Sequence, residues 1–112
     1  MDRKEIVRRY KHTPRPAGVY RVLHRPNGRM LVGASPDAPA MLNRVRAQLE
    51  MGSHPNRQLQ SDWEAVGPDE FVFEVVDLLA APEDPGADIG EDLQTLLDLW
   101  REKLQIDRES SY

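Results

Sequence analysis

The stretch AGVYRVLHRPNGRMLVGAS, residues 17–35, constrains the fold more than any other part of the chain. Residues 19–23 are rich in β-branched and aromatic side chains, which favour an extended strand. The sequence RPNG at residues 25–28 is typical of a hairpin turn, because Asn-Gly tolerates the positive φ that such turns need. Residues 29–34 predict the returning strand, with Gly33 near its end. This segment is therefore expected to form an antiparallel hairpin.

Helices are predicted on both sides of this hairpin. Before it, residues 2–10 form a short amphipathic pattern with basic residues on the polar faces. After it, Ser35 or Asp37 is expected to cap a helix that has Pro39 in its first turn. This helix should stop at Gly52, because glycine readily ends a helix.

A second helix is predicted directly after the first. Ser53 or His54 is its expected cap, and Pro55 its expected first residue. Gly67 should end it. The two helices thus form a pair between the hairpin and the next strand.

The last third of the chain predicts one strand and one helix. The sequence FVFEVV, residues 71–76, alternates as a strand does and places Glu74 on the face opposite the phenylalanines. Glu74 is therefore expected to face solvent, with a position in the candidate site as the alternative. Residues 89–104 carry an apolar stripe at helical spacing. The residues of this stripe are Ile89, Leu93, Leu96, Leu97, Trp100 and Leu104.

The order of elements predicts an α+β fold, in which a three-stranded antiparallel sheet is flanked by helices. At 112 residues the chain is long enough for one domain. We expect a helical extension over residues 1–14, the folded domain over residues 15–106, and a loose polar tail over residues 107–112.

Composition narrows the environment and the partners. The chain has no cysteine, no apolar run long enough to span a membrane, and no apolar core near its N-terminus, so we expect a cytoplasmic protein without a membrane partner. The net charge of −4 conceals an asymmetry: residues 1–60 carry about +8 and residues 61–112 about −12. A basic half favours nucleic acid as a partner. The alternative is that the halves neutralise each other, within one chain or between copies in a homo-oligomer.

The hairpin carries a paired signature. Gly18, Val19 and Tyr20, followed about ten residues later by LVGAS at residues 31–35, resemble the two motifs of the GIY-YIG endonucleases. The similarity continues through the segment MLNRVRAQLEMGSH, the LQSDW helix and the FVFE strand, so it covers residues 17–104. The resemblance implies the GIY-YIG fold.

The resemblance also implies metal-dependent phosphodiester cleavage, and the positions it carries over are two tyrosines, an arginine, two histidines and a metal-binding glutamate. Carried over position by position, the first tyrosine falls on Tyr20 and is intact, as is the histidine before the second helix, His54. The other four roles fall on Leu31, Met41, Val45 and Leu97. No cofactor is therefore expected, although Mg²⁺ or Mn²⁺ is implied if the chain is active.

Three residues remain candidates for catalysis, and each has a structural alternative. Arg44 lies one helical turn after Met41 and could replace an arginine there, or it is a solvated charge. Tyr20 could activate water, or it is a core residue with its hydroxyl at the rim. His54 could take part in the reaction, or it is no more than a helix cap.

These observations leave three functional hypotheses. The first is a GIY-YIG domain that binds nucleic acid, DNA in particular, with lost or strongly reduced cleavage. The second is an active metal-dependent endonuclease that uses Tyr20, Arg44 and His54. The third is a protein-interaction module or homo-oligomer without nucleic acid. The contacts expected under the first hypothesis are Arg21, Arg25, Arg29, Arg44, Arg46, Asn56 and Arg57.

Overall fold

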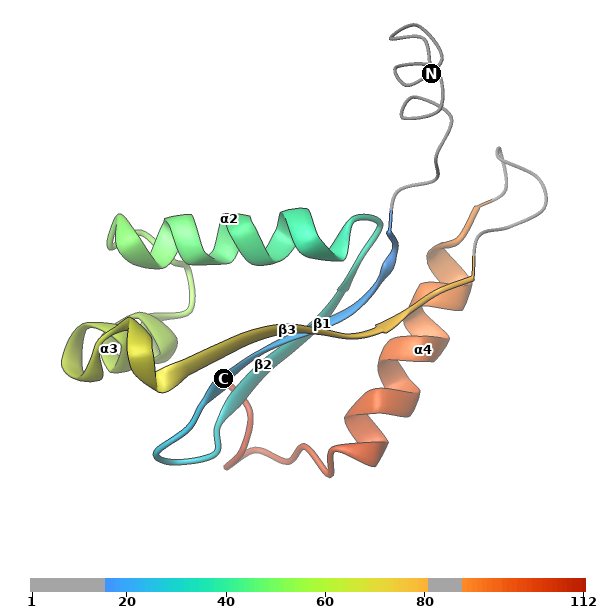
Figure 1. Cartoon of the computed structure of the whole chain (residues 1–112). Coiled ribbons are helices and arrows are strands. Elements are labelled where there is room, and N and C mark those ends of the chain that lie inside the picture. Colours follow the sequence, from blue (N-terminus) through green and yellow to red (C-terminus); the bar gives the residue numbers. More distant parts are fainter. Residues whose placement is uncertain (1–15, 81–87) are drawn as a thin grey trace, which may run out of the picture.

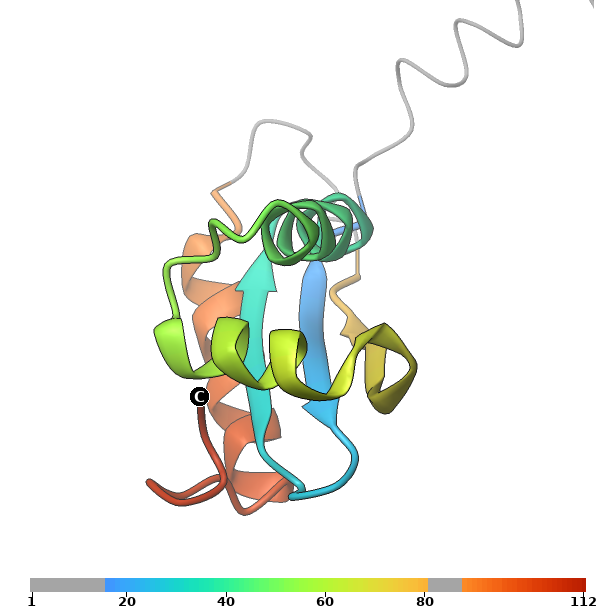
Figure 2. The ribbon, with the colours of Figure 1, turned by 90° about the vertical axis from the view of Figure 1, so that its left-hand side faces the viewer.

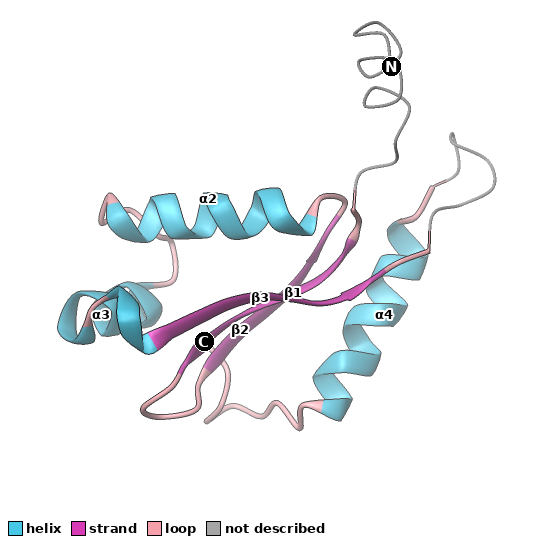
Figure 3. Ribbon diagram, viewed as in Figure 1, coloured by secondary structure: helices cyan, strands magenta, loops and turns pink. Residues whose placement is uncertain are grey.

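The computed structural model describes residues 16–80 and 88–112. Its strands are β1 (Gly18–His24), β2 (Met30–Ser35) and β3 (Phe71–Leu78), and its helices are α2 (Ala38–Glu50), α3 (Arg57–Val66), a short 3-10 helix η1 (Pro68–Glu70) and α4 (Gly90–Lys103) (Figures 1 and 3). The α+β class and the order of these elements are as predicted. The helix expected over residues 2–10 lies outside the described residues.

The three strands form one antiparallel sheet in the order β2-β1-β3. Gly33 of β2 and Val75 of β3 flank Tyr20 on either side. A bulge between Val19 and Tyr20 shifts the pairing of β1 with β3. The strand that carries the first signature is therefore central, and both outer strands align with it.

The helices cover both faces of the sheet. α2 and α3 lie on one face and α4 on the other, as the two perpendicular views show (Figures 1 and 2). Because side chains alternate along a strand, Tyr20 and Val22 point toward α2 and α3, whereas Val19 points toward α4. The core on the α2 side consists of Tyr20, Val22, Ala38, Leu42, Val45, Leu49, Leu59, Trp63 and Phe71. Leu93 is the buried residue of α4.

The start of α2 follows the sequence prediction. The Asp37 side chain caps α2 by accepting a hydrogen bond from the Ala40 N–H at 3.2 Å. Ser35 supports this cap, since its hydroxyl hydrogen-bonds Asp37. At the other end Gly52 takes a φ of +74°, which favours glycine and ends the helix as expected.

The start of α3 differs from the prediction. Its cap is Asn56, whose side chain accepts a hydrogen bond from the Leu59 N–H at 3.1 Å, so neither Ser53 nor His54 caps the helix. Pro55 lies before the cap rather than at the first helical position. Asn56 can cap α3 because its side chain reaches the Leu59 N–H, and the His54 imidazole is then free to accept the Asn56 N–H at 3.0 Å. His54 thus stabilises the turn that precedes the cap.

The hairpin turn lies over residues 25–28, as predicted. Gly28 alone in the turn takes a positive φ, of +74°, while Asn27 keeps a negative one and hydrogen-bonds the Arg29 N–H through its side chain. The His24 N–H donates to the Arg29 carbonyl at 2.8 Å and closes a four-residue loop. This four-residue loop needs one left-handed residue, and Gly28 supplies it.

The C-terminal tail was expected to be loose, and it is not. Ser111 pairs in parallel with Met30, and the Met30 N–H donates to the Ser110 carbonyl at 2.9 Å. The Tyr112 hydroxyl donates to the Asp62 carboxylate of α3 at 2.6 Å. The tail therefore occupies one end of the outer edge of β2 and ties it to α3.

None of the helices within the described segments is both long and apolar enough to cross a lipid bilayer.

Candidate functional site

Tyr20 is packed across the second strand of the hairpin. A Cβ placed on Gly33 would lie 2.5 Å from the Tyr20 hydroxyl oxygen and 2.7 Å from its Cζ. The phenol ring thus lies over the backbone of Gly33, where no side chain larger than hydrogen fits. The glycine of the second signature is therefore needed because the tyrosine of the first signature occupies its side-chain space.

Burial governs the chemistry of this tyrosine. Tyr20 is 9% exposed, and desolvation raises the pKa of its phenol above the ordinary value. A raised pKa keeps the phenol protonated at neutral pH. Burial therefore favours the neutral form of the Tyr20 phenol.

Apolar side chains occupy the neighbouring positions. Leu31 of β2 and Met41 of α2 are half-buried and pack against the core cluster that contains Tyr20. Val45, one turn beyond Met41, is buried within the same cluster. The positions to which the resemblance assigned a tyrosine, an arginine and a histidine therefore continue the hydrophobic core.

The position that the resemblance assigns to the metal-binding glutamate is also apolar. Leu97 lies half-buried in α4, in the apolar stripe with Leu93 and Trp100. Within residues 16–80 and 88–112 no three His, Cys, Asp or Glu side chains come together in a way that could hold a metal ion. Hard divalent cations need several oxygen donors, so the residues at these positions do not fit one.

His54 belongs to the turn between α2 and α3. The Nδ1 atom of its imidazole accepts a hydrogen bond from the Asn56 backbone N–H. The backbone N–H of His54 donates to the side-chain oxygen of Gln60 at 3.1 Å. Desolvation lowers the pKa of its imidazole below the ordinary value. The neutral imidazole of His54 thus stabilises the turn between α2 and α3. Tyr20, the other intact position of the resemblance, packs beside Gly33 in the sheet.

The arginines proposed as contacts do not share one face. Arg21 points to the α4 side of the sheet, where it forms an ion pair with Glu74 of β3. The Glu74 side chain stays 38% exposed in this pair, so it lies on the face opposite the phenylalanines and reaches solvent, as expected. Arg44 and Arg46 are exposed on α2. Arg46 is five residues after Met41, so at 3.6 residues per turn it lies on the opposite flank of the helix.

The remaining candidates lie at two loops. Arg25 in the hairpin turn and Arg57 at the start of α3 are exposed, whereas Arg29 is half-buried. Asn56 is half-buried and uses its side chain as the α3 cap.

Three contacts near these residues were not foreseen. The Arg46 guanidinium lies over the Phe73 ring, 4.3 Å from its centroid. The Trp100 indole N–H donates to the Asp77 carboxylate at 3.0 Å and joins α4 to β3. The side chain of His24 is buried against Phe71 at a centroid distance of 4.8 Å. The alternation of side chains along the strands could have predicted the pair of Arg21 and Glu74. The three contacts above join residues far apart in the sequence, and no sequence pattern predicts them.

Comparison with known proteins adds information on the fold. No protein-family model and no curated protein matches the sequence. Among solved structures, the catalytic domain of the homing endonuclease I-TevI matches with a TM-score of 0.66 at 19% identity, over 85% of this chain and 96% of that one. This chain has the GIY-YIG nuclease fold. A mutant of the I-TevI catalytic domain, described as an intron endonuclease and carrying alanine in place of one glutamate, gives a TM-score of 0.65 at 18% identity, over 87% and 91% of the two chains.

The GIY-YIG fold confirms the prediction made from the hairpin and the segments that follow it. At this level of identity the likeness concerns the path of the chain and not the chemistry of its side chains. The GIY-YIG sheet with its central Tyr20 is present, and the side chains around that tyrosine are apolar.

Proposed function

We propose that this GIY-YIG domain binds nucleic acid, DNA in particular, and has lost the standard phosphodiester cleavage of the fold. The observation that carries the proposal is the packing of Leu31 and Met41 against the cluster around Tyr20. Hydrolysis of a phosphodiester needs charged or polar groups that neutralise the phosphate and orient water. Side chains of leucine and methionine supply neither.

The same proposal accounts for the state of Tyr20. Its phenol is buried, and its pKa is raised rather than lowered. Under this proposal, the two signatures persist because Gly33 and Tyr20 pack against each other.

Binding is supported by the distribution of charge. All six basic residues of positions 16–60 are arginines, and Arg25, Arg44, Arg46 and Arg57 are exposed. Arginine forms paired hydrogen bonds with phosphate, and such contacts are tolerant of sequence and sensitive to salt. The similar structures are catalytic domains of a homing or intron endonuclease, which favours DNA among the nucleic acids.

The test combines cleavage and binding in one buffer series. Supercoiled plasmid is incubated with the protein and Mg²⁺ or Mn²⁺, and binding to a labelled duplex is followed by fluorescence anisotropy at low and high salt. We expect salt-sensitive binding without nicking.

Two results would contradict the proposal. Nicking that disappears in Tyr20→Phe would show an active nuclease with a displaced metal site. Absence of binding at low salt, with a molecular mass that changes with salt, would favour the homo-oligomer.

A further inference from the structure

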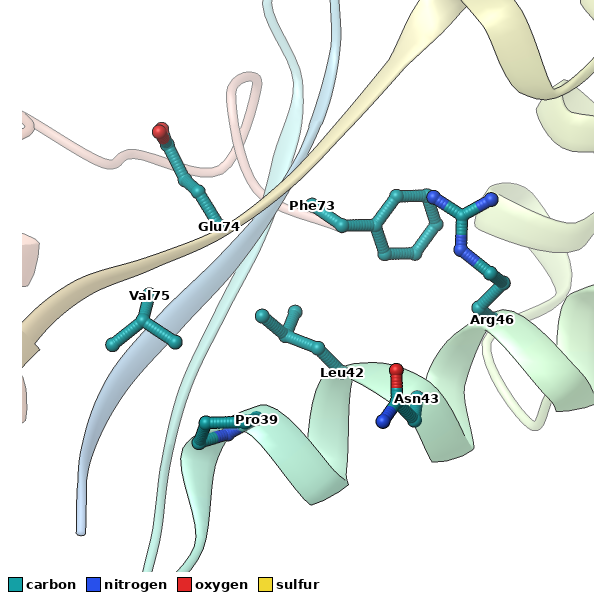
Figure 4. A pocket seen from close by; sticks show the side chains of 7 residues that line it. All are labelled: Pro39, Leu42, Asn43, Arg46, Phe73, Glu74 and Val75. Atoms are coloured by element: carbon teal, nitrogen blue, oxygen red, sulfur yellow. The ribbon is translucent and has the colours of Figure 1, made fainter. Parts of the chain in front are cut away.

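A pocket of about 350 Å³ lies between α2 and β3, at the sheet edge opposite β2. Within the described segments β3 pairs only with β1, so this outer edge is uncovered by another strand. Both α2 and β3 contribute apolar side chains to it, and α2 adds an amide and a guanidinium (Figure 4). The lining residues are Pro39, Leu42, Asn43 and Arg46 of α2, and Phe73, Glu74 and Val75 of β3.

Arg46 is held in place at one end of this pocket. Its guanidinium lies over the Phe73 ring, 4.3 Å from the centroid (Figure 4). Phe73 is itself fixed, because the Trp63 ring meets it edge-on at 5.9 Å and 86°. Stacking on an aromatic ring orients the plane of a guanidinium while leaving its N–H groups to donate in that plane.

The charge of Arg46 is available to a ligand. Across residues 16–80 and 88–112, no carboxylate lies within salt-bridge distance of its guanidinium. Glu74 borders the pocket, but its side chain points away from α2 and pairs with Arg21 on the other face of the sheet (Figure 4). The pocket therefore presents one uncompensated positive charge beside an apolar wall.

We propose that this pocket binds one unpaired nucleotide of a single-stranded nucleic acid, an inference that rests on the proposed function. The base lies against Pro39, Leu42 and Val75. Asn43 has both a donor and an acceptor for the edge of the base, and Arg46 donates to the adjoining phosphate.

Size and shape favour an unpaired nucleotide over a duplex. The volume lies at the lower end of the range of small-molecule pockets, about 300–1,000 Å³. A duplex shows only the edges of its bases in the grooves, so its base faces cannot reach the wall formed by Leu42 and Val75. An unstacked base offers its flat face, which can pack against the aliphatic side chains of Leu42 and Val75.

The experiment measures affinity for a labelled oligonucleotide as single strand and as duplex, by fluorescence anisotropy at low salt. The variants are Arg46→Gln and Arg46→Lys, with Arg101→Gln on exposed α4 as the matched control. We expect wild type to prefer the single strand. Arg46→Gln should weaken single-strand binding about tenfold, Arg46→Lys should restore little of it, and the control should change it less than about twofold.

Each outcome separates this inference from the proposed function. Weakening by Arg46→Gln that spares the duplex supports the pocket. Equal weakening by Arg46→Gln and Arg101→Gln, or a preference for duplex, overturns the pocket and leaves nucleic-acid binding in place. Full affinity in Arg46→Gln also overturns it and makes the open edge of β3 a site for another occupant, such as an extended peptide. No binding of either oligonucleotide overturns both proposals.

Discussion

At the scale of single residues, the contact between Gly33 and Tyr20 makes the clearest prediction. Gly33→Ala should lower the free energy of unfolding by about 1–3 kcal/mol, because a methyl group would lie 2.5 Å from the Tyr20 hydroxyl oxygen and the ring would have to move. Urea denaturation measures the change. Gly90→Ala is the matched control, since the nearest atom to its Cβ is the end of a flexible Asp88 side chain at 3.1 Å, and we expect less than about 1 kcal/mol there. Equal stability of Gly33→Ala and wild type would contradict the packing described for Tyr20.

His24 carries the second residue-scale prediction. Its side chain is buried, and neither ring nitrogen has a hydrogen-bond partner among the described residues, although Asp62 lies 3.8 Å from Nδ1. Burying such a group without partners costs free energy. We expect His24→Leu to raise the free energy of unfolding by about 1 kcal/mol in urea denaturation at pH 7, since leucine keeps most of the packing on Phe71 without polar atoms.

The outcome for His54 should be the reverse. His54→Leu removes the acceptor of the Asn56 N–H and should lower stability under the same conditions. A large loss of stability in His24→Leu would instead show that this imidazole has a partner, such as a buried water.

At the scale of elements, the C-terminal tail acts as a clasp between β2 and α3. Tyr112→Phe removes the hydrogen bond to Asp62 and should lower the free energy of unfolding by about 1–2 kcal/mol. Urea denaturation measures this change. The control Ser111→Ala keeps the phenol and should have a free energy of unfolding close to that of wild type. A variant Tyr112→Phe as stable as wild type would show that the hydrogen bond to Asp62 contributes nothing to stability.

The same contact predicts a dependence on pH. Burial, followed by the hydrogen bond to Asp62, raises the pKa of the Tyr112 phenol well above its ordinary value of about 10. A pKa raised by folding gives stability that is complete below the pKa of the unfolded chain and is lost as the pH rises through the folded one. The advantage of wild type over Tyr112→Phe should therefore be constant at neutral pH and shrink above about pH 10.

At the scale of the whole molecule, the proposed loss of cleavage predicts indifference to divalent cations. A ligand that binds only the folded state raises the melting temperature. Because Leu31, Met41 and Leu97 offer no oxygen ligands, Mn²⁺ should shift the melting temperature by less than about 1 °C relative to NaCl of equal ionic strength. A larger shift would contradict this prediction and would show that the folded chain binds the cation through other residues.

Local signals in the sequence were enough to predict most elements. β-branched and aromatic runs gave the strands, and glycines with positive φ, Gly52 and Gly67, ended the helices as expected. These signals depend on residues close together in the chain, where sterics and capping act. The start of α3 was misplaced because Ser53, His54 and Asn56 are all plausible caps, and the choice among them depends on the contact of His54 with Gln60.

The sequence by itself determined the order of the elements and, through the resemblance of its two signatures, the GIY-YIG fold. The tertiary structure decided how distant residues combine. It placed the Tyr20 ring over Gly33, joined Arg21 to Glu74, and brought Arg46 over Phe73. It also turned the polar tail into a clasp on β2 and α3. Backbone conformation is set largely by neighbouring residues, whereas these contacts join segments far apart in sequence, and only the folding of the sheet between its helices brings them together.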